Sequence, residues 1–170
     1  MPAFVLFPLA LLFPIVMAWG ASSDLLTMRI SNRLVLVLVT SFFVIALVVN
    51  LPLQQVALHV ACALAALAIG FTLFALRWIG GGDAKLAAAT TLWLGFDLAL
   101  PYLVYAGLLG GVLTLTILAL RSMPLTPFLA RYHWLERLHD RKQGVPYGIA
   151  LAIAGMLVYT NSTIFERLTA

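Results

Sequence analysis

Two acidic residues in apolar surroundings are the candidates for chemistry in this sequence. Asp83 follows three consecutive glycines, and Asp24 stands at the end of another apolar segment. A carboxylate near hydrocarbon is costly, so a carboxylate at a membrane edge is a candidate functional group. Two such groups that lie close together can share one proton and act as an acid and a base. We therefore interpret Asp24 and Asp83 as a catalytic pair, if the fold brings them together.

The composition predicts a membrane protein. Hydrophobic residues make up 64% of the 170 residues and charged residues 9%, whereas soluble domains have roughly 45–50% apolar and about 25% charged residues. A membrane-spanning helix needs about 20 residues, so the chain has room for about six spans and none for a separate soluble domain. We expect a single all-α transmembrane domain over residues 1–170. The one cysteine, Cys62, excludes a disulfide or a cysteine zinc site within the chain, and we expect no metal.

The apolar runs define the elements that must position the two aspartates. They cover residues 4–21, 34–49, 55–76, 84–97, 101–120 and 146–160, and Pro52, Pro101 and Pro146 punctuate them as helix-boundary residues do. The fourth run would span only about 21 Å of a hydrocarbon core about 30 Å thick. We therefore expect the triple glycine to form a non-helical turn at or below the membrane surface, where protein or a water-filled cavity must surround it.

The basic residues predict which side each break between the runs faces. Nine of the ten fall in or beside the breaks at residues 22–33, 77–85 and 121–145; they are Arg29, Arg33, Arg77, Lys85, Arg121, Arg131, Arg137, Arg141 and Lys142. Because cytoplasmic loops carry an excess of Lys and Arg, we expect these three breaks to be cytoplasmic and both termini to lie outside. Asp24 and Asp83 then share one face. Topology also accounts for the net charge of +4, so no nucleic-acid partner is expected.

Each aspartate also has a simpler interpretation. Asp83 would serve as an ordinary N-cap of the helix that follows it, and Asp24 would be a solvated carboxylate in a polar loop. A third interpretation is a small membrane transporter that uses both as proton or cation sites. Asp97 falls on the opposite side, where we expect an ordinary solvated residue. His59 lies mid-helix without a second ligand at helical spacing, so we expect no metal there.

Three segments resemble those of prepilin peptidases. Residues 24–32, DLLTMRISN, look like the D-x(5)-I-P-N segment of that family, with Ser31 in place of the usual proline. Residues 80–86, GGGDAKL, look like G-x-G-D-x-K-L, and residues 145–150, VPYGIA, are similar to the P-Y-G-x-A that opens the last helix. The departure at Ser31 concerns the local turn rather than Asp24.

The resemblance implies a GxGD-type aspartic endopeptidase in the bacterial inner membrane, with Asp24 and Asp83 catalytic at the cytoplasmic face. Such an enzyme removes the short basic leader from prepilins and needs no cofactor. The small size resembles the short TadV or CpaA members that serve Flp (tight-adherence) pili, so Flp-type pilins and pseudopilins are the implied partners, besides membrane lipid. A presenilin-like protease shares G-x-G-D but places its other aspartate in a Tyr-Asp pair. The residues implied to support the site or bind the substrate are Gly80, Gly82, Lys85, Asn32, Pro146, Tyr147 and Gly148.

Overall fold

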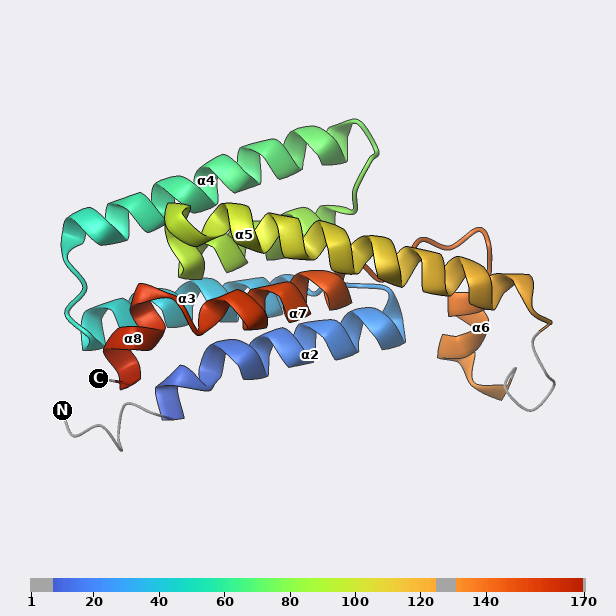
Figure 1. Cartoon of the computed structure of the whole chain (residues 1–170), viewed down its shortest axis with the longest axis horizontal. Coiled ribbons are helices and arrows are strands. Elements are labelled where there is room, and N and C mark those ends of the chain that lie inside the picture. Colours follow the sequence, from blue (N-terminus) through green and yellow to red (C-terminus); the bar gives the residue numbers. More distant parts are fainter. Residues whose placement is uncertain (1–7, 125–130, 170) are drawn as a thin grey trace.

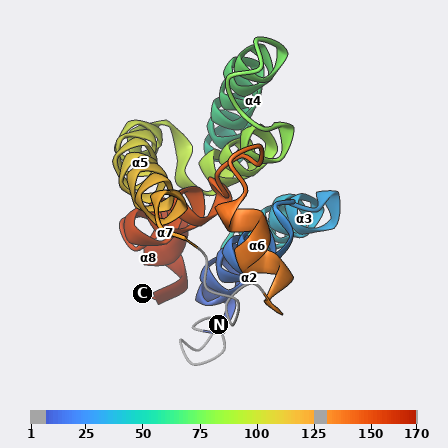
Figure 2. The ribbon, with the colours of Figure 1, turned by 90° about the vertical axis from the view of Figure 1, so that its right-hand side faces the viewer.

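The computed structural model describes residues 8–124 and 131–169, and in these residues it contains helices and no strand. The helices are α2 (Leu12–Thr27), α3 (Asn32–Val48), α4 (Leu53–Ala75), α5 (Gly81–Ser122), α6 (His133–His139), α7 (Gly148–Tyr159) and α8 (Thr163–Thr169). The predicted all-α fold class is therefore confirmed. Figure 1 shows α2, α3, α4, α5 and α7 aligned along one axis, and Figure 2 looks along that axis, with α7 between α2 and α5.

Several of these helices are long and apolar enough to cross a membrane. Three of them pass this test among the described residues, at Pro8–Thr27, Leu53–Ala75 and Gly81–Ser122, and α7 with α8 forms a fourth if a pair bent by 55° counts as one span. The helix α3 is apolar but only 17 residues long. These helices make the protein an integral membrane protein. Judged by length and composition, the described residues contain three or four helices that could span a membrane, fewer than the six spans expected.

The helix α5 reverses its direction at Gly95. This residue has φ 70° and ψ −178°, a conformation that is essentially restricted to glycine. Figure 1 shows the chain running one way before this point and the opposite way after it. Tyr102 lies beside Thr90, although 12 residues of straight helix would separate them by about 18 Å. The tight turn expected between the fourth and fifth apolar runs is therefore present, but it lies at Gly95 rather than at residues 98–100, and Pro101 is not a helix boundary because it lies within the second half of α5.

A buried histidine supports this reversal. His59 of α4 places its Nδ1 atom 2.8 Å from the carbonyl oxygen of Leu92. Carbonyls in the last turn of a helical segment have no partner within the helix, and His59 supplies one here. The same ring leaves no room for a side chain at the turn, since a Cβ atom on Gly95 would lie 3.1 Å from His59 Cε1.

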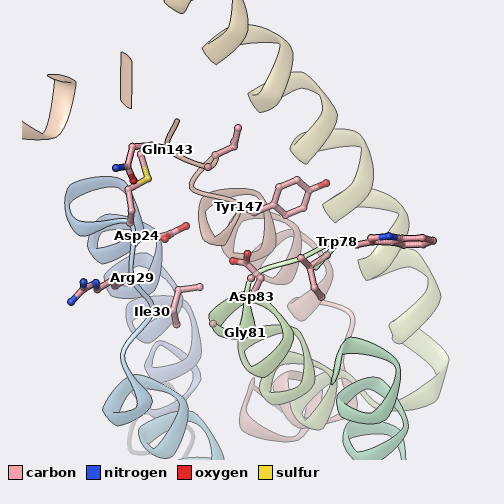
Figure 3. A pocket seen from close by; sticks show the side chains of 14 residues that line it. Asp24, Arg29, Ile30, Trp78, Gly81, Asp83, Gln143 and Tyr147 are labelled. Atoms are coloured by element: carbon pink, nitrogen blue, oxygen red, sulfur yellow. The ribbon is translucent and has the colours of Figure 1, made fainter. Parts of the chain in front are cut away.

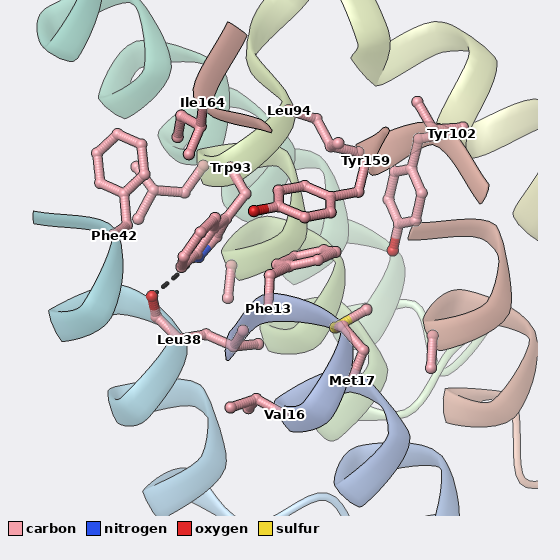
Figure 4. Close-up of a cluster of buried hydrophobic side chains, with 14 of the residues drawn as sticks. Phe13, Val16, Met17, Leu38, Phe42, Trp93, Leu94, Tyr102, Tyr159 and Ile164 are labelled. Carbon is pink, nitrogen blue, oxygen red and sulfur yellow. Dashed lines mark hydrogen bonds between the residues drawn. The ribbon is translucent and has the colours of Figure 1, made fainter. Parts of the chain in front are cut away.

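The hydrophobic core runs along the bundle, from Leu34 and Leu86 near the basic breaks to a cluster of aromatic rings farther along the helices. The Phe13 ring lies 5.1 Å from that of Trp93 and 4.5 Å from that of Tyr159, between ring centroids. Trp93 Nε1 donates a hydrogen bond of 3.0 Å to the Leu38 carbonyl oxygen, so the indole joins α5 to α3 as well as filling space (Figure 4). These contacts tie α2, α3, α5 and α7 together at one end and fix where their other ends meet.

Those other ends carry the basic breaks, and helices shorten every predicted loop there. The helix α2 continues to Thr27, so Asp24 lies in its last turn rather than in a loop over 22–33. The helix α5 begins at Gly81, so the expected loop 77–85 ends there. Of the three glycines that we expected in a non-helical turn, only Gly80 is non-helical, as the extended N-cap, whereas Gly81 and Gly82 belong to the helix. The predicted loop 121–145 holds the end of α5 and all of α6, while its residues 125–130 lie outside the described part of the chain.

Candidate active site

Asp24 is held by its backbone and by its side chain. The chain leaves α2 at Met28, which has a left-handed φ of 55° and donates its N–H to the Asp24 carbonyl oxygen at 2.8 Å. The carboxylate oxygen Oδ2 accepts a 2.7 Å hydrogen bond from the N–H of Gly148, and the residue is only 5% exposed. Because Gly148 begins α7, this N–H is one of the free donors at a helix N-terminus, where a negative charge is favourable.

Glycine is required at position 148 by the closeness of its neighbours. A Cβ atom there would lie 2.8 Å from Asp24 Oδ2 and 2.9 Å from Ile30 Cδ1. No ordinary side chain fits at these distances without moving the carboxylate. The buried Pro146 precedes this contact, and the half-buried Tyr147 lines the cavity described below. The ring of Tyr147 occupies the space that a side chain at Gly110 would need.

Asp83 is the third residue of α5, and Gly80 is the N-cap of that helix. The Asp83 carboxyl group accepts a hydrogen bond from the Gly80 N–H, as acidic residues at the third helical position commonly do. The alternative in which Asp83 is the N-cap is therefore wrong. A Cβ atom on Gly80 would lie 2.8 Å from Asp83 Oδ2, so glycine at this position also permits the close approach of backbone and carboxyl group.

The two carboxyl groups face each other across one cavity (Figure 3). The cavity has a volume of about 800 Å³, and the charges of Asp24 and Asp83 interact within it. Its walls come from the end of α2, the start of α5 and the segment before α7; they are Asp24, Met28, Arg29, Ile30, Trp78, Ile79, Gly80, Gly81, Gly82, Asp83, Gln143, Gly144, Val145 and Tyr147. Segments that are far apart in the sequence thus bring both acids to one cavity.

Ile30 is the packing centre of the site. Its side chain lies against Gly148, and a Cβ atom on Gly82 would meet Ile30 Cβ at 3.2 Å. The glycines at 82 and 148 therefore let the starts of α5 and α7 close onto the α2–α3 loop. Sequence reasoning did not single out Ile30, although it occupies the isoleucine position of the D-x(5)-I segment.

Two predicted supporting residues meet outside the cavity walls. Lys85 Nζ donates a 3.1 Å hydrogen bond to Asn32 Oδ1, and both side chains are exposed. The contact joins the first turn of α5 to the first turn of α3. Ser31, which stands where the family has proline, is the N-cap of α3, and its Oγ accepts a hydrogen bond from Leu34 N–H at 3.3 Å. The turn is thus stabilised by a cap.

Several wall residues were not predicted. Trp78, which is 75% exposed, follows Arg77 at the end of α4 and stands at the rim of the cavity. Gln143 lies on the side of the cavity opposite the α4–α5 loop (Figure 3). No charge pattern or motif marks these residues, because only the folded path of their segments brings them to the cavity. Asp97 is exposed and lies in the second half of α5, outside the cavity walls.

Comparison with known families completes this picture. Residues 11–115 match the model of the type IV leader peptidase family. The match covers more than half of the chain and includes both Asp24 and Asp83, while the segment at 145–150 lies beyond it. Searches of curated proteins and of solved structures returned no match. The chain belongs to the type IV leader peptidase family, whose members are membrane peptidases that act on prepilins.

Proposed function

We propose that this protein removes prepilin leaders by aspartic proteolysis of the GxGD type, with Asp24 and Asp83 as the catalytic pair. Family membership supports the general activity. The single observation that carries the residue assignment is that both carboxyl groups face one cavity (Figure 3). Two carboxyl groups with one proton between them supply the acid and the base that peptide hydrolysis requires.

The reaction follows from this arrangement. The ionised carboxylate takes a proton from a water molecule, whose oxygen forms a bond to the scissile carbonyl carbon. The protonated carboxyl group gives its proton to the carbonyl oxygen as the tetrahedral intermediate forms. The C–N bond then breaks, and the proton held by the base passes to the departing amine. At the same time one hydroxyl group of the intermediate returns its proton to the carboxylate that had acted as the acid, so the new carboxyl group forms and the pair again holds one proton. The two groups titrate as a pair, so the mechanism is written for the pair and assigns neither role to one residue.

The supporting residues act through geometry. Gly80, Gly82 and Gly148 allow the three segments to approach closely enough for the carboxyl groups to face each other. Tyr147, after the buried Pro146, forms part of the wall against which an extended substrate segment binds. The Lys85–Asn32 hydrogen bond keeps the starts of α5 and α3 together. This set needs no cofactor.

The substrate is proposed to be a prepilin of the Flp type or a related pseudopilin. Its basic leader would lie on the cytoplasmic side, and its apolar helix would lie in the membrane beside the bundle. Within the family, we propose the short TadV or CpaA subclass. Purified protein incubated in detergent with an Flp-type prepilin should release the leader as a peptide that mass spectrometry identifies. A type IV prepilin is incubated in parallel. If the protein cuts the type IV prepilin but not the Flp-type prepilin, the proposed subclass is wrong, and if it cuts neither, the proposed function is wrong.

The topology is proposed as six spans in the inner membrane, with the active site at the cytoplasmic face and both termini outside. Support comes from the reversal at Gly95, which divides α5 into two antiparallel halves, and from the basic breaks at one end of the bundle. Ser122 and Asn161 are both exposed. Ser122 ends α5 and Asn161 lies between α7 and α8, and Figure 1 shows the end of α5 and the junction of α7 with α8 at opposite ends of the bundle. In a Cys62→Ala background, Ser122→Cys should be labelled only from the cytoplasm and Asn161→Cys only from outside. Labelling of both from one side would contradict six spans.

The transporter alternative is less well supported. A transporter requires a path that continues from the aspartates to the other side of the membrane. Beyond the cavity lie the packed rings of Phe13, Trp93 and Tyr159, each buried. Proteoliposomes that contain the wild-type protein should therefore show no proton flux above empty vesicles, and flux that disappears in Asp83→Asn would favour transport.

A further inference from the structure

Arg121 is a buried cation outside the catalytic pair. It lies in the last turn of α5, where Figure 1 shows this helix extending past the ends of α2, α3 and α4, with α6 beside it. The residue is 8% exposed. Its guanidinium donates two hydrogen bonds to backbone carbonyls, from Nε to Leu138 at 2.7 Å and from a terminal nitrogen to Gly144 at 2.8 Å.

These two bonds fix a segment that we call the strap, residues 137–147. Arg121 holds it at Leu138 and again at Gly144, so one side chain closes the loop between α6 and α7. At its start, Arg137 donates a 2.6 Å hydrogen bond to the carbonyl oxygen of Leu26 in α2. The strap therefore joins the end of α5 to the end of the helix that carries Asp24.

The strap is also a wall of the cavity. Its residues 143–145 and Tyr147 line the space that Asp24 and Asp83 face. The position of the strap therefore helps to set the shape of the space that a bound peptide segment would fill. The Gly148 N–H that binds Asp24 follows directly, but it belongs to α7, which packs against α2 and α5 along its own length.

The chemistry of Arg121 suits this task. Burial of a charge is costly unless its donors are satisfied, and within the described residues no carboxylate pairs with this guanidinium. Two carbonyl oxygens satisfy it instead. The rigid planar fork of arginine can bind two fixed acceptors at once, whereas the single ammonium of lysine cannot reproduce that geometry.

We propose that Arg121 is a positioning residue that holds the strap as the substrate-binding wall of the active site. This inference rests on the proposed function. It assigns Arg121 to substrate binding rather than to the chemical step, because Asp24 and Asp83 keep their own anchors at Gly148 and Gly80 when the strap loosens. When the strap is loose, part of the free energy of substrate binding is used to order it. The substrate then binds more weakly, and KM rises.

The test compares Arg121→Met with Arg121→Lys and with Arg33→Met. Methionine keeps much of the apolar stem and removes all donors, and Arg33 is an exposed cation on the same side outside the cavity walls. Arg121→Met should raise KM for a prepilin about tenfold with kcat within about threefold of wild type, the pattern of lost binding rather than lost chemistry. Arg121→Lys should recover part of KM, and Arg33→Met should resemble wild type.

Trypsin sensitivity measures the anchoring without reference to activity. Cleavage after Arg137, Arg141 and Lys142, all in the strap, should be faster in Arg121→Met than in wild type or Arg33→Met. A wild-type KM in Arg121→Met, or a loss confined to kcat, would overturn the inference. If Arg121→Met does not fold, Arg121→Lys decides, since a wild-type KM there would reduce Arg121 to a folding role. A wild-type protein that cuts no prepilin refutes the proposed function, while the trypsin rates still test the strap.

Discussion

Gly148→Ala tests how the structure holds Asp24. The new Cβ atom would lie 2.8 Å from Asp24 Oδ2, whereas ordinary contacts begin near 3.4 Å. The carboxylate would therefore have to move by about 0.6 Å, and the same Cβ atom would also meet Ile30 Cδ1 at 2.9 Å and Asp24 Cβ at 3.1 Å. The 2.7 Å hydrogen bond from the Gly148 N–H to Asp24 would lengthen or break.

The expected magnitudes follow from this geometry. A misplacement of about 1 Å at a reacting group costs about 100-fold in rate, so a shift of about 0.6 Å should lower kcat by about 10- to 100-fold. A hydrogen bond to a charged group contributes about 1.5–3 kcal/mol, and alanine gains up to about 1 kcal/mol over glycine in a helix. The net loss of stability should therefore be about 0.5–2 kcal/mol.

The assay is steady-state cleavage of a prepilin in detergent, together with thermal unfolding of the same preparations. Gly111→Ala is the matched control, because a Cβ atom there meets nothing within 4 Å, and it should leave both kcat and stability unchanged or slightly improved. A Gly148→Ala protein with wild-type kcat would refute the role given to the Asp24–Gly148 contact.

Three further outcomes are expected. Met28→Gly should be more stable than Met28→Ala by about 1 kcal/mol in thermal unfolding. The φ angle at Met28 is 55°, and a residue with a Cβ atom loses about that much free energy in the left-handed conformation, whereas glycine does not. Equal stabilities would argue against strain at Met28. His59→Leu leaves the Leu92 carbonyl without its partner and should lower stability by about 1–3 kcal/mol with KM unchanged, so a stable variant would contradict its role at the reversal. Gly80→Ala should lower kcat more than Gly82→Ala, because its Cβ atom would meet the Asp83 carboxylate at 2.8 Å whereas that of Gly82 meets Ile30 at 3.2 Å; the reverse order would count against the geometry.

The sequence was sufficient for the fold class and for the shared location of the two aspartates. Apolar runs report burial in lipid or core directly, and Lys and Arg accumulate in the breaks at one end. The sequence predicted the end of the first helix less reliably, because a side-chain hydrogen bond can keep a polar residue within a helix. Ser22 resembles loop sequence, yet its Oγ donates to the Ala18 carbonyl at 2.8 Å, and such back-bonding lets a polar residue stay within a helix. The helix therefore runs past Asp24.

Other features depend on tertiary contacts that no local pattern reports. By residue type, Pro101 was the stronger candidate for a helix break. The chain turns at Gly95 instead, and the tertiary contacts around this turn, with the His59 ring and between α4 and α5, are visible only in the folded structure. Arg121 had the sequence signature of a cation at a membrane edge. Its second role emerges only because the strap folds back over it and buries it.

The most direct measurement of the central claim is prepilin cleavage by Asp24→Asn, Asp83→Asn and the double variant. Asparagine keeps an acceptor for the Gly148 N–H and caps about as well as aspartate, so folding should survive while the exchangeable proton is lost. Each single change should lower kcat by about 1000-fold or more, the double variant should be no worse than either, and the exposed Asp97→Asn control should cleave normally. A folded Asp24→Asn or Asp83→Asn protein that cuts at a near wild-type rate would contradict the catalytic pair.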